Sequence, residues 1–75
     1  MKVERVWIDT DYIRLQDLLK LSGVCSTGGM AKVVIQNGEV NVNGEVCTMR
    51  GKKMRAGDFA EFEDTKVEVE QKSEG

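Results

Sequence analysis

The chain has 75 residues, of which 32% are charged and 40% hydrophobic, with a net charge of −2 and no histidine. A chain this short buries only about 60% of the surface that its unfolded form exposes, so we expect one domain over residues 1–75 without a deep catalytic pocket. Because the chain lacks histidine, the commonest general base near neutral pH, an enzyme is not expected. No apolar run approaches the roughly 20 residues that span a bilayer, which argues against a membrane protein.

The N-terminal part of the sequence predicts a strand followed by a short helix. The segment VERVWID alternates two sets of side chains, which is typical of a strand, here expected over residues 2–9. From Leu15 the period changes, because Leu15, Leu18 and Leu19 follow the i, i+3, i+4 spacing of a helix face. Gly23 can end this helix by adopting a left-handed conformation.

A second helix is predicted directly after the first. Ser26 or Thr27 can cap it by accepting a hydrogen bond from an unpaired backbone N–H, and Gly38 can close it. Its apolar stripe is expected at Met30, Val33 and Val34, with Ala31 and Ile35 at the flanks. Two short packed helices therefore precede the rest of the chain.

The C-terminal half reads as short strands joined by turns. Val40 and Val42 alternate with polar residues, and Asn43-Gly44 is a strong hairpin signal that places the return strand at Glu45-Val46. The segment CTMRGKKMRAGD is expected to be an exposed basic loop ending in a turn at Gly57-Asp58. Strands are then expected at 59–62 and 66–70, with a frayed tail at 71–75. The predicted class is α+β: two short packed helices, then a small mostly antiparallel sheet, with an added N-terminal strand.

Charge is unevenly distributed along the chain. Between Arg14 and Gly57 there are seven bases and three acids, a net charge of +4, whereas the remainder has four bases and ten acids, a net charge of −6. A basic middle can bind a polyanion although the overall pI is acidic. The net charge of the whole chain therefore does not exclude a nucleic-acid partner.

Two parts of the basic middle form the candidate binding surface. Unpaired N–H groups at a helix start attract phosphate, glycines there leave the amides uncovered, and RGKKMR places four cations within six residues. The candidate residues are Ser26, Thr27, Gly28, Gly29, Lys32, Gln36, Arg50, Lys52, Lys53 and Arg55. These residues alone leave open a purely structural interpretation, in which Gly28-Gly29 is a flexible entry to the helix and the loop a solvated turn.

The remaining residue types add little chemistry. Aromatic residues, which stack on single strands, all lie outside the basic middle in sequence; Phe62 and Trp7 are expected in the core and Tyr12 at an edge. The acidic run Glu61, Glu63, Asp64 is most simply a solvated strand face. These residues therefore fit a protein that recognises the phosphate backbone and folded shape of RNA better than one that binds RNA by stacking on its bases.

The two cysteines indicate whether a metal or cofactor is expected, and the N-terminal residues indicate in which cellular compartment the protein is expected. Cys25 and Cys47 belong to no CxxC pair and cannot close a four-ligand zinc site, so we expect reduced thiols, no metal and no cofactor. A disulfide between them is the alternative. MKVERVWIDT carries acids where a signal peptide needs an apolar stretch, which predicts a cytoplasmic protein.

A larger pattern resembles a known family. The residues that carry it are Leu15-Gln16-Asp17-Leu18-Leu19, Ser26, Met30-Ala31-Lys32, the segment GEVNVNG at 38–44, and Gly57-Asp58. In this order they resemble the ribosomal protein S-four-type RNA-binding domain, or αL motif, over about residues 12–63. LKLSGVCSTGGMAK and RGKKMRAGD further resemble its stand-alone members, the small bacterial YaaA/YbcJ proteins.

The resemblance implies a non-enzymatic module that docks on structured RNA, ribosomal or transfer RNA, with ribosome association a further implication and a monomer expected. It implies that Ser26 and Thr27 lie at the phosphate-facing helix start, that Lys32 is a basic helix residue of the family, and that the RGKKMR cations follow the hairpin. One departure is that many members have arginine directly after the serine, where this chain has Thr27.

Two other function classes stay open at this stage. VNVNGE and RAGDFAEF suit a ubiquitin-like β-grasp carrier, although such carriers need a Gly-Gly end, whereas Glu74 precedes Gly75 here, and their helix follows the hairpin instead of preceding it. A protein-interaction module that docks through its acidic strands is the second alternative.

Overall fold

The computed structural model describes residues 1–72, so the part of the predicted tail at 73–75 lies outside the described residues. The elements, in chain order, are β1 (Lys2–Ile8), β2 (Ile13–Arg14), α1 (Leu15–Leu21), α2 (Gly28–Gln36), β3 (Val40–Val42), β4 (Glu45–Val46), β5 (Lys53–Met54), β6 (Phe59–Phe62) and β7 (Thr65–Gln71). Both helices precede the β3–β4 hairpin, which is the opposite order to that of a β-grasp carrier.

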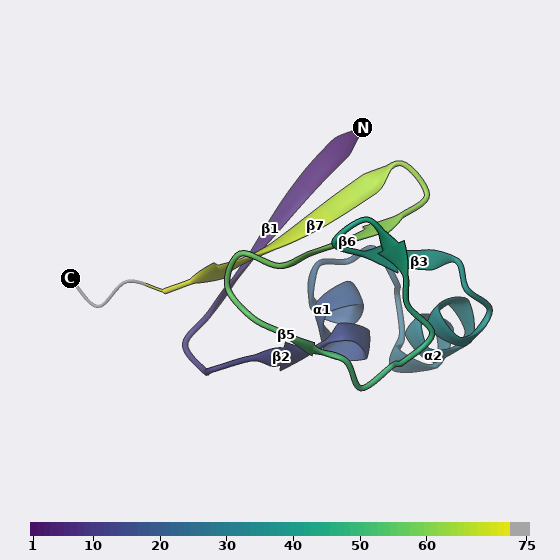
Figure 1. Ribbon diagram of the computed structural model, residues 1–75, viewed down its shortest axis with the longest axis horizontal. Helices are drawn as coiled ribbons and strands as arrows, with labels where there is room; N and C mark the ends of the chain where they lie inside the picture. Colours follow the sequence, from purple (N-terminus) through teal and green to yellow (C-terminus); the bar gives the residue numbers. More distant parts are fainter. Residues whose placement is uncertain (73–75) are drawn as a thin grey trace.

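The strands form two sheets. The larger has the order β1-β7-β6-β3-β4, in which only the β1–β7 pair is parallel, and the smaller is an antiparallel ribbon of β2 and β5. Figure 1 shows α1 between the larger sheet and this ribbon, with α2 beside it. The predicted class is therefore confirmed: two packed helices and a mostly antiparallel sheet with an added N-terminal strand.

Local turn chemistry places the hairpin as the sequence predicts. Asn43 and Gly44 have φ angles of 51° and 88°, and they join the paired residues Val42 and Glu45. Two central residues with positive φ define the type I′ turn, whose twist matches that of the flanking strands. Gly23 and Gly38, at φ angles of 84° and 77°, end the two helices in the left-handed conformation.

The buried face of α2 differs from the predicted stripe. Met30 and Val33 are 39% and 54% exposed, and the buried side chains are Ala31, Val34 and Ile35. Both sets obey helical periodicity, so the pattern alone does not fix which way the helix is rotated about its axis. Ala31, Val34 and Ile35 all belong to the hydrophobic core, so packing against the rest of the fold selects the observed face.

The basic segment between β4 and β5 is less loose than the sequence suggests. Met54 is fully buried, and β5 pairs with β2 in the register Ile13 opposite Met54. The backbone also donates from Leu15 N to the Lys52 carbonyl at 2.8 Å and from Gln16 N to the Arg50 carbonyl at 3.1 Å. The prediction of a wholly exposed loop was therefore wrong, because strands of two residues are too short to show any periodicity.

Trp7 also departs from its predicted place, since it is 54% exposed whereas Phe62 is in the core. Along β1 the inward side chains are Val6 and Ile8, so Trp7 points to the opposite face of the sheet, away from the helices. Neither helix within residues 1–72 has the length and apolar character needed to cross a membrane.

Candidate nucleic-acid interface

The start of α2 presents hydrogen-bond donors to the solvent. Thr27 is the N-cap: its Oγ1 accepts from the Met30 amide at 3.0 Å, and its carbonyl accepts from the Ala31 amide at 3.1 Å. Within residues 1–72 no hydrogen bond is made by the amides of Gly28 and Gly29, the first two residues of the helix. Because a helix start also carries a partial positive charge, these two amides form a position suited to a phosphate oxygen.

Neither glycine is required by the packing of the chain itself. A Cβ at Gly28 would meet no atom within 4 Å, and a Cβ at Gly29 would meet only Thr27 Oγ1, at 3.8 Å. Their φ angles are not positive, so other residues could adopt this backbone. Their presence costs helix stability, and it leaves the approach to the free amides open.

We expect the double variant Gly28→Ala, Gly29→Ala to be more stable than the wild type but weaker in RNA binding. Alanine in a helix is favoured over glycine by roughly 0.5–1 kcal/mol per residue, with less at a helix end, whereas two methyl groups would stand where a phosphate approaches. Thermal unfolding and RNA titration measure the two effects. A stabilised variant that binds RNA as tightly as the wild type would show that Gly28-Gly29 is only a flexible entry to the helix.

The second part of the surface is the basic loop, defined here as residues 50–55. Its four cations are exposed, and its backbone is held against the start of α1 by the bonds of Lys52 and Arg50 described above. The β2–β5 register adds Arg14, which lies opposite Lys53. Sequence reasoning did not include Arg14 among the candidate residues, because only the pairing of two short strands brings it to the loop.

Tyr12 is a second residue that sequence reasoning placed elsewhere. The Lys53 Nζ lies over the Tyr12 ring, 5.0 Å from its centroid, which is within the range of a cation–π contact. Tyr12 precedes the basic middle in sequence but touches it in space. An aromatic side chain is thus part of the basic surface.

The basic middle, residues 14–57, differs from the rest of the chain in the ion pairs that its cations make. The ion pairs in the described residues join Lys2 to Glu4 (3.2 Å), Arg5 to Glu68 (3.3 Å) and Lys66 to Glu68 (3.7 Å). All of these cations lie outside residues 14–57. Over residues 1–72 the cations of the basic middle are consequently left without a carboxylate partner.

All ten candidate residues are exposed, but they form two groups instead of one continuous cluster. Ser26 to Gln36 lie on or just before α2, and Arg50 to Arg55 lie on the basic loop. Helix α1 packs against both α2 and β5. No hydrogen bond or ion pair in residues 1–72 joins the two groups directly, so α1 is the element that positions them relative to each other.

Cys25 takes no part in this surface chemistry. Both thiols are free, and Cys25 is fully buried. Burial, with a smaller contribution from the charge of Glu63, raises the pKa of the Cys25 thiol above its ordinary value. A buried thiol with a raised pKa is unreactive. The described residues also contain no cluster of three or more cysteine, aspartate or glutamate side chains that could hold a metal ion.

The fold and this surface define a small α+β module with two packed helices, a hairpin-rich sheet and an unpaired basic face. Comparison with protein families gives the class: residues 6–70 match the family model described as "S4 domain". The chain belongs to the S4 domain family.

Two curated relatives cover most of the chain and most of their own length. The chain is 46% identical over 56 residues to the protein named "Probable ribosome maturation protein RlbA" of Bacillus subtilis (strain 168), a match to 75% of this chain and 79% of that protein. It is 40% identical over 58 residues to "Putative RNA-binding protein YbcJ" of Escherichia coli (strain K12), covering 77% and 83%. These similarities agree with the resemblance of the sequence to the small stand-alone members of this family.

Proposed function

We propose that this protein binds structured RNA through backbone phosphates and shape, using the start of α2 and the basic loop as its two contact areas. The observation that carries the proposal is the segregation of ion pairs. Three of the four cations of the acidic parts, Lys2, Arg5 and Lys66, pair within the chain, whereas those of the basic middle are exposed and have no carboxylate partner in the described residues. Such cations can neutralise phosphates without first breaking an internal ion pair.

Each contact area has a distinct part in this proposal. The amides of Gly28 and Gly29 and the hydroxyls of Ser26 and Thr27 donate to one phosphate group, with Lys32 and Gln36 further along the same helix. Arg50, Lys52, Lys53 and Arg55 contact phosphates of a neighbouring backbone segment. Because α1 fixes the distance between the two areas, the pair favours an RNA whose folded shape presents phosphates at that spacing.

The class of RNA is part of the proposal. The relative named for RNA binding supports RNA as the partner, and the relative named for ribosome maturation favours ribosomal RNA, with transfer RNA as the alternative. The non-enzymatic, monomeric and cytoplasmic character expected from the sequence belongs to the same proposal, as does association with the ribosome.

The affinity for a structured RNA hairpin should fall steeply with salt. With four to six phosphates neutralised, a log–log plot of affinity against salt concentration should have a slope of about −3 to −5, since each contact contributes about −0.7 to −0.9. Fluorescence anisotropy across a salt series measures this slope. A flat salt response would contradict the proposal, because contacts that release no counterions do not involve phosphates.

A further inference from the structure

A groove lies beside the basic loop, where β2 meets the first turn of α1. It is a shallow, open hollow of about 440 Å³, lined by Thr10, Tyr12, Ile13, Arg14 and Asp17. A second hollow of about 340 Å³ shares Ile13 and Asp17 with it and extends along α1. The two hollows adjoin at Ile13 and Asp17 and are together called the groove.

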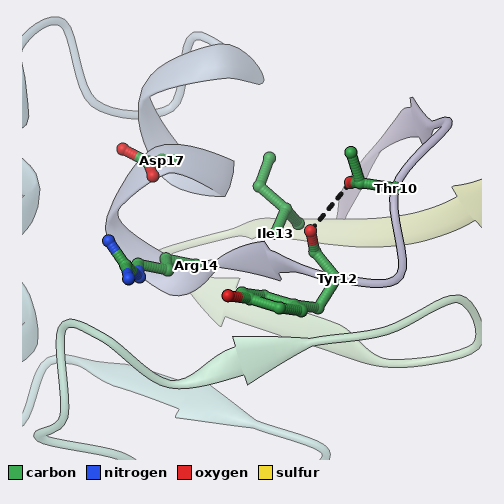
Figure 2. Close-up of a pocket in the computed structure, with 5 residues that line it drawn as sticks. All are labelled: Thr10, Tyr12, Ile13, Arg14 and Asp17. Atoms are coloured by element: carbon green, nitrogen blue, oxygen red, sulfur yellow. Dashed lines mark hydrogen bonds between the residues drawn. The ribbon is translucent and has the colours of Figure 1, made fainter.

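The walls of the groove combine an aromatic ring, an aliphatic side chain and charges of both signs. Figure 2 shows the Tyr12 ring with Ile13 above it, and Arg14 and Asp17 extending toward the same side of the view. Lys53 already covers one face of the Tyr12 ring, so a ligand can stack only on the other face. Thr10 Oγ1 donates to the Tyr12 carbonyl at 2.8 Å, which fixes the turn that carries the ring.

Asp17 gives the groove a specific hydrogen-bonding requirement. Its carboxylate is exposed and makes no hydrogen bond or ion pair within residues 1–72, although the exposed side chain of Arg14 lines the same hollow. An ionised carboxylate only accepts hydrogen bonds, so its ligand must offer donors. Among the bases, guanine presents two adjacent donors on its Watson–Crick edge, whereas uracil presents a single donor between acceptors.

We infer that this groove holds one unpaired base, preferentially guanine, of the structured RNA bound by the adjoining basic surface. The base stacks on Tyr12 and contacts Ile13, its donor edge meets Asp17, and Arg14 and Lys53 at the rim meet the flanking phosphates. The inference rests on the proposed function, and it adds a base-reading position to a surface that otherwise reads phosphates and shape.

The test compares two RNA hairpins that are identical except for one bulged guanosine in the stem. Since stacking contributes about 1–3 kcal/mol per base, the wild-type protein should bind the bulged hairpin about 5- to 150-fold more tightly than the plain one. Tyr12→Leu should bind both hairpins alike, and a cooperative thermal unfolding transition shows that this variant is folded. Tyr12→Phe, which keeps the ring, should retain the preference.

Asp17 is tested by exchanging the bulged nucleotide. The wild type should prefer guanosine over adenosine, cytidine and uridine, and Asp17→Asn should lose this preference while still favouring any bulge over none, because stacking on Tyr12 is retained. A preference for guanosine that survives Asp17→Asn would overturn the role of the carboxylate.

The outcomes separate this inference from the proposed function. If the wild type binds the plain and bulged hairpins equally well, the groove holds no base but phosphate binding stands. If Tyr12→Leu keeps the full preference for the bulge, the base lies elsewhere and the inference is wrong. If neither hairpin is bound with a salt-dependent affinity, the proposed function fails and the inference fails with it.

Discussion

Replacing Arg50, Lys52, Lys53 and Arg55 together by alanine should lower the affinity for a structured RNA by about 30- to 1,000-fold. This range follows from roughly 0.5–1 kcal/mol for each exposed charge contact. The salt slope should become shallower by about 3 units, because each lost cation removes one phosphate contact. Anisotropy titrations at several salt concentrations measure both quantities on the same samples.

The variant should remain folded, because the loop is attached through its backbone and through Met54. The hydrogen bonds from Leu15 and Gln16 end on the carbonyls of Lys52 and Arg50, which alanine retains. Lys53 and Arg55 are exposed, and among the side-chain contacts within residues 1–72 the one that is lost is that of Lys53 with Tyr12. A loss of RNA binding can therefore be assigned to the missing charges.

A matched control removes the same number of positive charges elsewhere. Lys2, Arg5, Lys66 and Lys72 lie in the acidic parts of the chain, and three of them pair with Glu4 or Glu68. Their replacement by alanine gives the same net charge as the loop variant and should change the affinity far less. Equal losses in the two variants would mean that only the overall charge matters, and no loss in the loop variant would mean that the basic loop is solvated surface.

Met54→Ala should cost about 2–5 kcal/mol of the free energy of unfolding. Met54 is fully buried against the core, and truncating such a side chain loses transfer free energy and leaves a cavity. At roughly 0.05–0.15 kcal/mol per residue, a chain of this length has only about 4–11 kcal/mol of stability, so the change is a large fraction of the total. Urea unfolding followed by circular dichroism measures it.

Met49→Ala in the same segment is the control for this change. Met49 is 66% exposed, so its truncation should alter stability by less than about 0.5 kcal/mol. Similar small effects for both methionines would contradict the structure of this segment, in which Met54 anchors β5 and with it the basic loop.

The elements specified by local signals could be predicted from the sequence. The leucine spacing in α1, a cap of α2 at Ser26 or Thr27 and the Asn43-Gly44 turn each act within a few residues, and the structure has all three, with Thr27 as the cap. Gly23 and Gly38 likewise end the two helices in the left-handed conformation, as predicted. Such signals do not depend on contacts with distant parts of the chain.

The features that depend on distant contacts could not be predicted in this way. The rotation of α2 about its axis, the burial of Met54 and the exposure of Trp7 are decided by which elements pack together. The β2–β5 ribbon is too short for periodicity to show, and it is this ribbon that brings Arg14 and Tyr12 to the basic loop. Tyr12, the aromatic part of the basic surface, was therefore not predicted. The charged part was predicted, because the cations at residues 50–55 are clustered in the sequence itself.

The most direct test of the central claim is the change in amide NMR signals when the ¹⁵N-labelled protein is titrated with a structured RNA hairpin. We predict that the shifted signals belong to Gly28, Gly29 and their neighbours on α2 and to residues 50–55. Signals of the outer sheet face around Arg5, Glu61 and Glu68 should stay unchanged. Shifts confined to that outer face, or no shifts at RNA concentrations that give binding by anisotropy, would contradict the claim that α2 and the basic loop form the RNA-binding surface.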